Sequence, residues 1–226
     1  MPDRGLLEPA MVEGVELDTS AALTLRVARW LQVTFEVERE AALALMPADV
    51  GRPIPPYARL LVAGSPGGNL ALLSVGGRYR MMPRNVLAGA VADGRFEAVR
   101  GLFGSGCTAG AVTLERDGAA VAAEVSGPEG PLVSVRLPDI YAIEPTMLRW
   151  DAFVVLGRHD GTPSIAEVTP AHELSAAFLS KGASVEADRA LPRTHPWRRL
   201  ACLNVISACY AEGTLKFGEP VIAQAL

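Results

Sequence analysis

Potential nucleophiles gather in the stretch GSGCTA, residues 104–109. It holds Ser105, Cys107 and Thr108 within a relaxed GxGxxG pattern. Covalent catalysis needs a base beside the nucleophile, and no histidine is near in the sequence. A dinucleotide fingerprint needs a helix after the glycines, whereas the following AVTLERDG is typical of a strand. We therefore predict a flexible loop or tight turn here, in which the cysteine is a small buried side chain.

Charged side chains offer a second kind of chemistry. Arg78, Arg80 and Arg84 lie close together, and a strand would place the first two on one face. Such arginines could bind a carboxylate or polarise a carbonyl, or they could form a solvated outer face. Glu97 precedes the glycine-rich stretch, and Glu167 is the acidic residue near the end of the hairpin-like stretch GRHDGTPSIAEV. We name Glu167, Glu97 and Arg80 as candidates for acid–base or carbonyl-polarising roles. A structural salt bridge is the alternative for Glu167.

The histidines do not form a recognisable metal motif. His159, His172 and His195 are widely spaced. His172 and Glu173 are adjacent and could do acid–base work, or they could be an exposed loop pair. We predict no metal ion and no cofactor.

The composition of the 226 residues limits the possible partners. The net charge is −4 and the pI is about 5.5, which argues against a nucleic-acid or anionic-membrane binder. Only Lys181 and Lys216 are available for lysine chemistry. The acidic start without a long apolar run indicates no secretory signal. Three cysteines without a CxxC pair indicate no disulfide framework, and we expect a cytoplasmic protein.

The elements that must position these residues are mostly strands. Alternation predicts a long strand over 21–37. The turn SPGGN predicts paired strands over 58–64 and 70–77, and an Asp-Gly turn predicts a hairpin over 110–126. Residues 38–46 predict a short helix stopped by Pro47. Later stretches predict more strands, so the fold class is mainly β, with a few short helices. We expect an N-terminal arm over 1–20 and one domain over 21–226.

Three collinear stretches carry a resemblance. FEVEREAALALMPADVGRPIPPYARLLV (35–62) has a strand, helix, turn and strand in order. VLGRHDGTPSIAEV (155–168) has the pattern of a D-G-x-P hairpin, and PWRRLACLNVISACYAEGTLKFGEPVIAQAL (196–226) has that of a closing segment and last strand. Together they resemble the acetoacetate decarboxylase family. The resemblance implies a closed, cone-like antiparallel β-barrel around a ligand cavity, and a homo-oligomer.

The chain departs from this family where its chemistry lies. The resemblance implies a Schiff-base lysine within residues 94–110, and that stretch has none. The family's two buried glutamates align with Leu61 and Val75. Its arginine aligns beside Ala28, with Arg29 on the opposite strand face. The cavity is thus expected to be apolar.

Three functional hypotheses remain open. The first is an enzyme that binds a hydrophobic, polyketide-like carbonyl compound and promotes a cyclisation, isomerisation or elimination without an imine. The second is a binding protein without chemistry. The third is a decarboxylase or aldolase-like enzyme in which Lys216 points inward and forms the imine. The expected substrate-binding residues are Leu61, Val75, Cys107 and Lys216.

Overall fold

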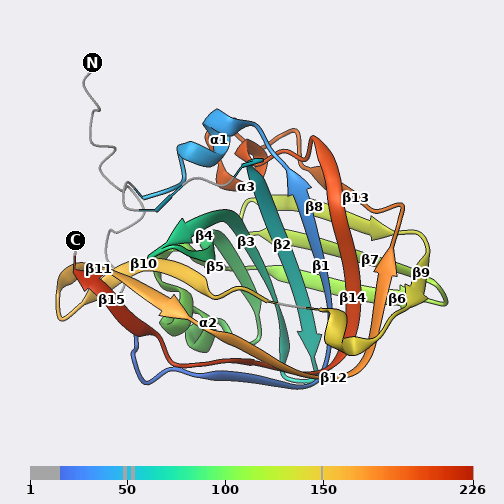
Figure 1. Cartoon of the computed structure of the whole chain (residues 1–226), viewed down its shortest axis with the longest axis horizontal. Helices are drawn as coiled ribbons and strands as arrows, with labels where there is room; N and C mark the ends of the chain where they lie inside the picture. The colour runs from blue at the N-terminus through green and yellow to red at the C-terminus, as the bar shows by residue number, and fades with distance from the viewer. Residues whose placement is uncertain (1–15, 48–49, 52–53, 149, 226) are drawn as a thin grey trace.

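Strands dominate the computed structural model, which describes residues 16–47, 50–51, 54–148 and 150–225 (Figure 1). Within these ranges no helix is both long and apolar enough to cross a membrane. The prediction of a mainly β fold with a few short helices is confirmed. The helices are α1 Arg39–Leu43, α2 Phe96–Phe103 and α3 Pro196–Arg199, with 3-10 turns η1 Gly104–Gly106 and η2 Pro145–Met147.

A strongly bent 11-stranded sheet forms the body of the molecule. Its order is β15-β11-β10-β4-β3-β2-β1-β14-β12-β9, with β5 paired to β4. Among the named strands of the described residues, the β4–β5 and β4–β10 pairings are parallel and the others are antiparallel. The strands are β1 Leu23–Glu36, β2 Tyr57–Ser65, β3 Gly68–Tyr79, β4 Met82–Asp93, β5 Cys107–Ala109, β9 Ile140–Ala142, β10 Phe153–His159, β11 Thr162–Val168, β12 Pro170–Ser180, β14 Asn204–Phe217 and β15 Val221–Ala225.

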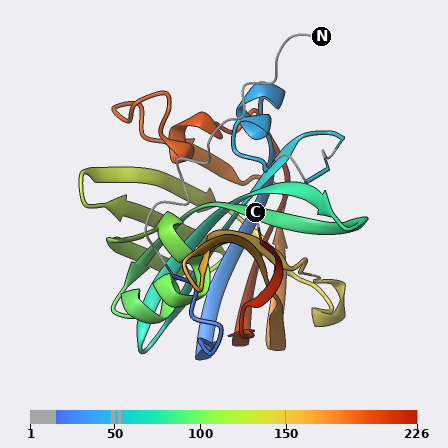
Figure 2. The ribbon, with the colours of Figure 1, turned by 90° about the vertical axis from the view of Figure 1, so that its left-hand side faces the viewer.

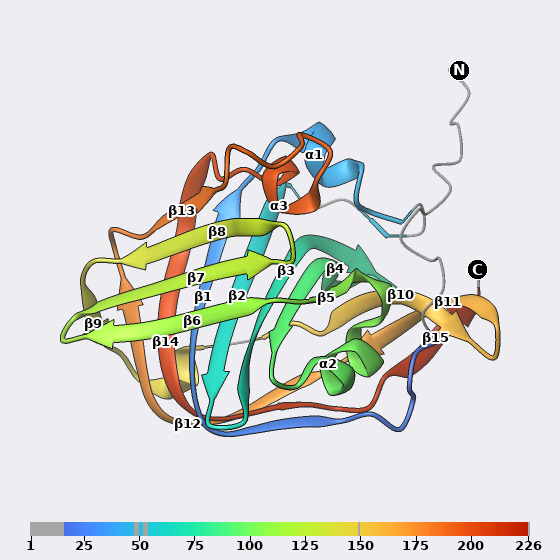
Figure 3. The same ribbon diagram turned by 180° about the vertical axis from the view of Figure 1, so that it is seen from behind.

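A second, four-stranded sheet packs across the first, as Figure 3 shows from behind. Its order is β13-β8-β7-β6, so β6 is an edge strand. The strands are β6 Ala111–Asp117, β7 Ala120–Gly127, β8 Gly130–Leu137 and β13 Ser184–Ala187. The β6–β7 hairpin was predicted, and Gly118 has the positive φ of 58° that its tight turn requires.

The alternation of side chains divides the core between the two faces of the large sheet. One face carries Val33, Leu60 and Val75 and packs against the small sheet; we call it the convex face. The other carries Trp30 and Leu61 and surrounds the side chains of α2, β10 and the bent ends of β1 and β14; we call it the concave face. Both faces are buried, which explains why the central strands read as nearly continuous apolar runs.

Three features differ from the sequence prediction. The two end strands, β15 and β9, do not pair with each other among the described residues, so the strand pairing does not show a closed barrel. β4 and α2 had not been predicted, and Pro83 within β4 disguises a strand because proline is rare inside sheets. The stretch around Arg80 is not a continuous strand, because Arg80 and Met81 form a hairpin turn with positive φ.

The expected N-terminal arm lies partly outside the described residues, which begin at 16. Glu16 forms a bridge with Arg158 of β10, and Leu17 is buried. Leu17 packs so close to Gly157 that a Cβ there would meet its side chain at 2.5 Å. Residues 16–17 therefore lie against the body of their own chain. In Figure 2 the end of the molecule that carries β10, β11 and β15 faces the viewer.

Candidate functional site

A polar cluster interrupts the apolar concave face. The strand register pairs Arg59 of β2 with both Thr34 of β1 and Ser74 of β3, so the three side chains share that face. Gln32, one pair further along β1, lies on the same face. Together with two residues from elsewhere in the chain they form the Arg59 cluster: Gln32, Thr34, Arg59, Ser74, Asn85 and Asp151.

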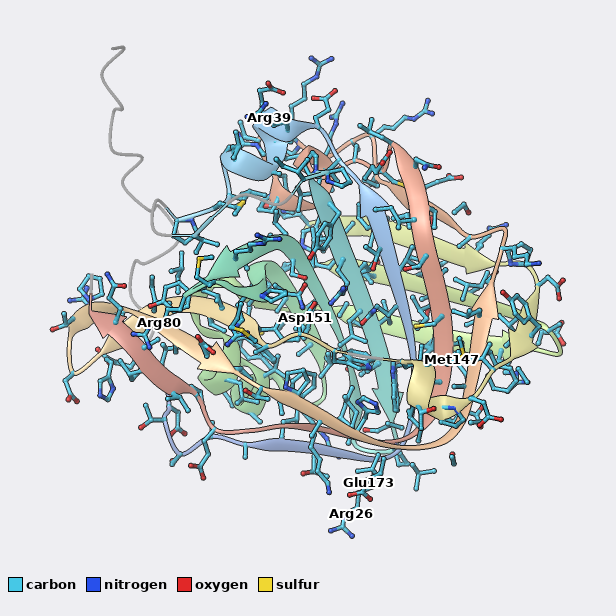
Figure 4. The ribbon with its side chains drawn as sticks, viewed as in Figure 1. Arg26, Arg39, Arg80, Met147, Asp151 and Glu173 are labelled. Carbon is cyan, nitrogen blue, oxygen red and sulfur yellow. The ribbon has the colours of Figure 1, made fainter. Side chains whose placement is uncertain are left out.

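An ion pair lies at the centre of this cluster. Nη1 of Arg59 lies 3.4 Å from Oδ2 of Asp151, and its Nε donates to Oγ1 of Thr34 at 3.4 Å. The Arg59 side chain is 13% exposed and that of Asp151 is 36% exposed. Asp151 lies in residues 150–152, which precede β10 and cross the concave face (Figure 4). The guanidinium is therefore largely enclosed, while the carboxylate opens to solvent.

Asn85 and two tryptophans fix this crossing segment. The Asn85 backbone N–H donates to the carbonyl of Ala152 at 2.9 Å, and its Nδ2 donates to the carbonyl of Asp151 at 3.1 Å. Trp150 meets Trp30 edge to face, with ring centroids 6.0 Å apart. These contacts hold the Asp151 carboxylate in place against β1 and β2.

Several buried polar atoms around the cluster have unused hydrogen-bonding capacity. Nε1 of Trp30, Oε1 of Gln32 and Oδ1 of Asn85 have no partner among the described residues. A buried polar atom left unpaired costs about 1–3 kcal/mol, so such atoms are uncommon in a core that serves packing alone. Two further atoms of this kind, Oγ of Ser180 and Nδ1 of His195, lie outside the cluster. The three beside the ion pair offer hydrogen bonds that a polar ligand or water could complete.

Tyr57 adds a hydroxyl at the edge of the cluster. Its ring lies directly over Gly76, where a Cβ would come within 2.0 Å of the tyrosine Cζ. Burial raises the pKa of Tyr57, although the nearby Arg59 lowers it. The phenol is thus protonated at neutral pH and can donate a hydrogen bond.

A row of mostly apolar side chains runs through Gln32 of the cluster towards the edge of the sheet. The register places Leu61, Gln32, Cys209, Leu179 and Tyr141 side by side across β2, β1, β14, β12 and β9. Tyr141 is exposed and Cys209 is buried. Leu61 is also buried, so only the end of this row at Leu179 and Tyr141 reaches the surface.

The structure does not bring the three predicted catalytic residues together. Glu167 forms a salt bridge with Arg84 at 2.8 Å, both being under 20% exposed. Glu167 alternates with Ala166 and Val168 of the concave core, so it lies on the convex face. Glu97 is exposed in the first turn of α2. Arg80 is exposed in the β3–β4 turn, where it donates to the carbonyl of Ala223. Their catalytic roles remain untested predictions.

Leu61 and Val75 do not line one cavity, which corrects the sequence interpretation. Leu61 pairs with Leu72 on the concave face, whereas Val75 pairs with Ala58 on the convex face. Both are buried, at 1% and 0% exposure. Leu61 borders the Arg59 cluster through Gln32, and Val75 is part of the core between the sheets.

Cys107 is buried in β5, and its surroundings suppress its reactivity. Burial raises the pKa of its thiol from 9.0 to about 12. A thiol is nucleophilic only as the thiolate, so the structure gives no support to covalent catalysis at this residue.

Lys216 does not point inward, which corrects a further prediction. Leu215 and Phe217, its neighbours in β14, take the concave core positions, so the lysine must face outward. Its Nζ lies 2.6 Å from Oε1 of Glu173, and its side chain is 44% exposed. His172 packs on Trp150 instead of joining Glu173, because adjacent strand residues face opposite ways.

The described residues also show no enclosed position for Lys181 and no set of metal ligands. Lys181 is exposed and lies over the ring of Tyr141. The stretch where the family resemblance implies a lysine contributes buried apolar side chains, chiefly Leu102 and Phe103. Within the part of the chain that the structure describes, no group of three histidine, cysteine or acidic residues could hold a metal ion.

Comparison with solved structures identifies the architecture. An acetoacetate decarboxylase superposes with a TM-score of 0.76 at 11% identity, covering 100% of this chain and 96% of that one. The chain has the acetoacetate decarboxylase fold. The sequence resemblance is thereby confirmed for the fold, although the sequence matches no family model. A search of curated proteins found no significant relative.

Two other structures with this fold show its functional range. One is an acetoacetate decarboxylase-like enzyme from Sphingomonas wittichii RW1, with a TM-score of 0.71 and 17% identity over 92% of this chain and 94% of that one. The other is the enduracididine biosynthesis enzyme MppR complexed with pyruvate, with a TM-score of 0.71 and 13% identity over 90% of each chain. The fold thus occurs in more than one kind of enzyme.

The sequence analysis missed the Arg59 cluster. A signal for part of it was present, because Arg59 is the one charged residue in the apolar run YARLLVAG. No local signal marked Asp151, which lies 92 positions away and meets Arg59 only in the folded chain.

Proposed function

We propose that this protein is an enzyme that binds a small hydrophobic carbonyl compound at the Arg59 cluster and promotes isomerisation, cyclisation or elimination without an imine. The grouping of Trp30, Gln32 and Asn85, whose buried polar atoms lack partners, around the Arg59–Asp151 pair carries this proposal. The apolar side chains that surround the cluster on the concave face, among them Trp30 and Leu61, support a substrate with an apolar body.

The proposed chemistry is proton transfer through an enolate. Arg59 is positioned to donate to the carbonyl oxygen of the substrate and to stabilise negative charge there. The Asp151 carboxylate removes a proton from the adjacent carbon, and the C–H electron pair moves onto the carbonyl oxygen. Returning the proton to another carbon gives isomerisation. Expulsion of a leaving group or attack on a second carbonyl gives elimination or cyclisation.

The length of the Arg59–Asp151 contact is compatible with this role. At 3.4 Å it is longer than the 2.7–2.9 Å typical of charge-assisted hydrogen bonds. A carbonyl oxygen could therefore compete for the guanidinium without having to break a short bidentate pair. Enclosure of Arg59 strengthens its electrostatic effect on the bound oxygen, because water screens it less.

Exchange of carbon-bound protons for deuterium tests this proposal. The full-length protein would be incubated in D2O with pyruvate, 2-oxooctanoate or 2-octanone, and the loss of the proton signal beside the carbonyl followed by NMR. We expect faster exchange than in buffer, and preference for 2-oxooctanoate over pyruvate because of its apolar chain. Arg59→Met and Asp151→Asn should each reduce the rate at least about ten-fold, equivalent to about 1.4 kcal/mol.

Matched controls separate the site from general effects of charge. Arg26→Met and Asp139→Asn change exposed residues outside the cluster and should leave the exchange unchanged. Exchange at the buffer rate with all three compounds would overturn the enzymatic proposal. Saturable binding without exchange, lost in Arg59→Met, would instead support the binding-protein alternative.

The relocated-lysine alternative is tested in the same samples. Borohydride reduction followed by intact mass measurement would trap an imine on Lys216 or Lys181. We expect no adduct, since Lys216 pairs with Glu173 outside the concave face. A trapped adduct that disappears in Lys216→Met would contradict the proposed mechanism.

A further inference from the structure

A ligand-sized groove lies on the opposite side of the large sheet from the Arg59 cluster. It is a groove of about 720 Å³ between the edge strand β6 and the convex face of β1, β2, β12 and β14. Figure 3 shows β6 as the lowest strand of the small sheet, above the bend of these strands. The volume falls within the range of about 300–1,000 Å³ typical of small-molecule sites.

Irregularities in neighbouring strands accompany the groove. The β1–β14 register shifts between Leu25 and Ala28, where Val27 has a φ of 53°. The β12–β14 register shifts beside Gly213, whose φ is 150°. β-Bulges bend strands and are over-represented next to functional sites. Left-handed backbone at a valine is rare and costs about 1–2 kcal/mol. Val27 and Gly213 both line the groove.

The groove contains a positive charge that the protein does not neutralise. Arg29 and Glu212 face each other in the strand register and both line the groove. The Glu212 carboxylate, however, accepts hydrogen bonds at Oε1 from Arg116 Nη1 and from the Tyr210 hydroxyl, each at 2.9 Å. Among the described residues Arg29 makes no hydrogen bond or ion pair, which leaves its guanidinium available to an anion.

The remaining walls combine neutral polar groups with apolar ones. Ser65, Asn69 and Thr214 provide hydroxyl and amide groups, and Leu114 and Pro66 provide apolar surface. The Asn69 amide donates to the carbonyl of Val112 at 2.7 Å and thereby ties β6 to the large sheet. This hydrogen bond and the Arg116–Glu212 pair both join β6 to the large sheet, so the two walls of the groove are linked directly.

We infer that this groove is a second binding site, for a small organic carboxylate with an apolar or aromatic body. The carboxylate pairs with Arg29, and the body lies between Val27 and Leu114. This site lies on the convex side and shares no residue with the Arg59 cluster, so its occupancy does not depend on the function proposed above.

Fluorescence titration with 1-naphthoate, and with the neutral 1-naphthamide as a comparison, tests this inference. Both titrations would use the full-length Arg59→Met variant, so that the carboxylate cannot bind at the first cluster. We expect saturable 1-naphthoate binding that weakens with salt, and weaker binding of the amide. Adding Arg29→Gln should weaken 1-naphthoate binding about ten-fold or more, as loss of a charged hydrogen bond does.

Two further variants make the result specific. Arg26→Gln removes an exposed arginine three residues away on the same strand, which points away from the molecule in Figure 4, and should leave binding unchanged. Leu114→Trp fills the groove with a larger side chain and should abolish binding. Equal 1-naphthoate affinity in the Arg29→Gln and Arg26→Gln proteins, or unchanged binding in Leu114→Trp, would overturn the inference.

Discussion

At the scale of single residues, burial decides which thiols can react. Cys107 and Cys209 are 7% and 5% exposed, and Cys202 is half-buried. Burial raises the pKa of Cys107 to about 12 and that of Cys209 to about 11. It also raises the pKa of Cys202, which retains more access to solvent. Because the thiolate fraction falls about ten-fold per pKa unit, the three cysteines should differ sharply in rate.

Alkylation of the native protein should therefore mark Cys202 first. With iodoacetamide at pH 8, we expect peptide mass spectrometry to find Cys202 modified at least about ten-fold faster than Cys107 and Cys209. In urea all three should react at similar rates, which provides the control. Rapid native modification of Cys107 would contradict this and would revive a nucleophilic role for the glycine-rich stretch.

At the scale of the strands, both bulges contain a residue with positive φ, but only one of them has room for a side chain. Gly213 has left-handed backbone, and a Cβ there would lie 2.1 Å from the carbonyl oxygen of Glu173. That contact is with backbone and cannot be relieved by rotating a side chain. Val27 has a φ of 53° while its side chain is 77% exposed. A β-branched residue therefore occupies a conformation that glycine would adopt more easily.

Substitution at these positions should move stability in different directions. We expect Gly213→Ala to lower the free energy of unfolding by more than about 2 kcal/mol, since both strain and overpacking oppose it. Val27→Gly should be neutral or stabilising by up to about 1 kcal/mol, because relief of strain offsets the greater freedom of glycine when unfolded. Urea unfolding at equilibrium measures both. A Val27→Gly protein less stable by 2 kcal/mol or so would show that the positive φ is not strained.

At the scale of the whole molecule, the two sheets are joined by one charged residue as well as by the apolar core. Arg116 of the small sheet pairs with Glu212 of the large sheet and lies over the rings of Phe178 and Tyr210, at 4.7 and 5.4 Å from the centroids. Burial, together with the Glu212 carboxylate, raises the pKa of Tyr210 to about 12. The Tyr210 phenol, which lies between the sheets, therefore resists ionisation, as do the thiols of Cys107 and Cys209 in the large sheet.

Stability should fall in alkaline solution for this reason. Cys107, Cys209 and Tyr210 have folded-state pKa values above their ordinary ones, 9.0 for cysteine and 10.0 for tyrosine. Their contribution to the free energy of unfolding is fully present below pH 9. It is lost as the pH rises towards 11–12, because the unfolded chain then releases protons that the folded chain retains. Each group adds a slope of up to about 1.4 kcal/mol per pH unit.

Urea unfolding between pH 8 and 11 checks this expectation. The free energy of unfolding should decline with a slope that rises as cysteine and then tyrosine ionise in the unfolded state. Cys107→Ala should reduce that slope, whatever its own effect at pH 8. A flat profile over this range would contradict the burial of these groups.

The sequence by itself determined the strand content and the family resemblance that led to the fold. Alternating residues predicted β1, because a strand exposes alternate side chains to two environments. Turn residues between apolar stretches predicted the β2–β3 pair and the β6–β7 hairpin. It also showed that the lysine was absent from residues 94–110. The positions of the candidate functional residues were harder to predict. Alternation sorts the side chains of a strand into two faces, but it does not tell which face lines the interior.

Only the tertiary structure decided which side chains meet. The positions of Leu61 and Val75 differ by an even number, yet the register of the β2–β3 hairpin, which pairs Leu61 with Leu72, places the two side chains on opposite faces. Lys216 faces outward because its neighbours fill the concave core. Asp151 reaches Arg59 from 92 positions away through a segment of irregular backbone. Such contacts arise from the packing of distant segments, and no local pattern of residues encodes them.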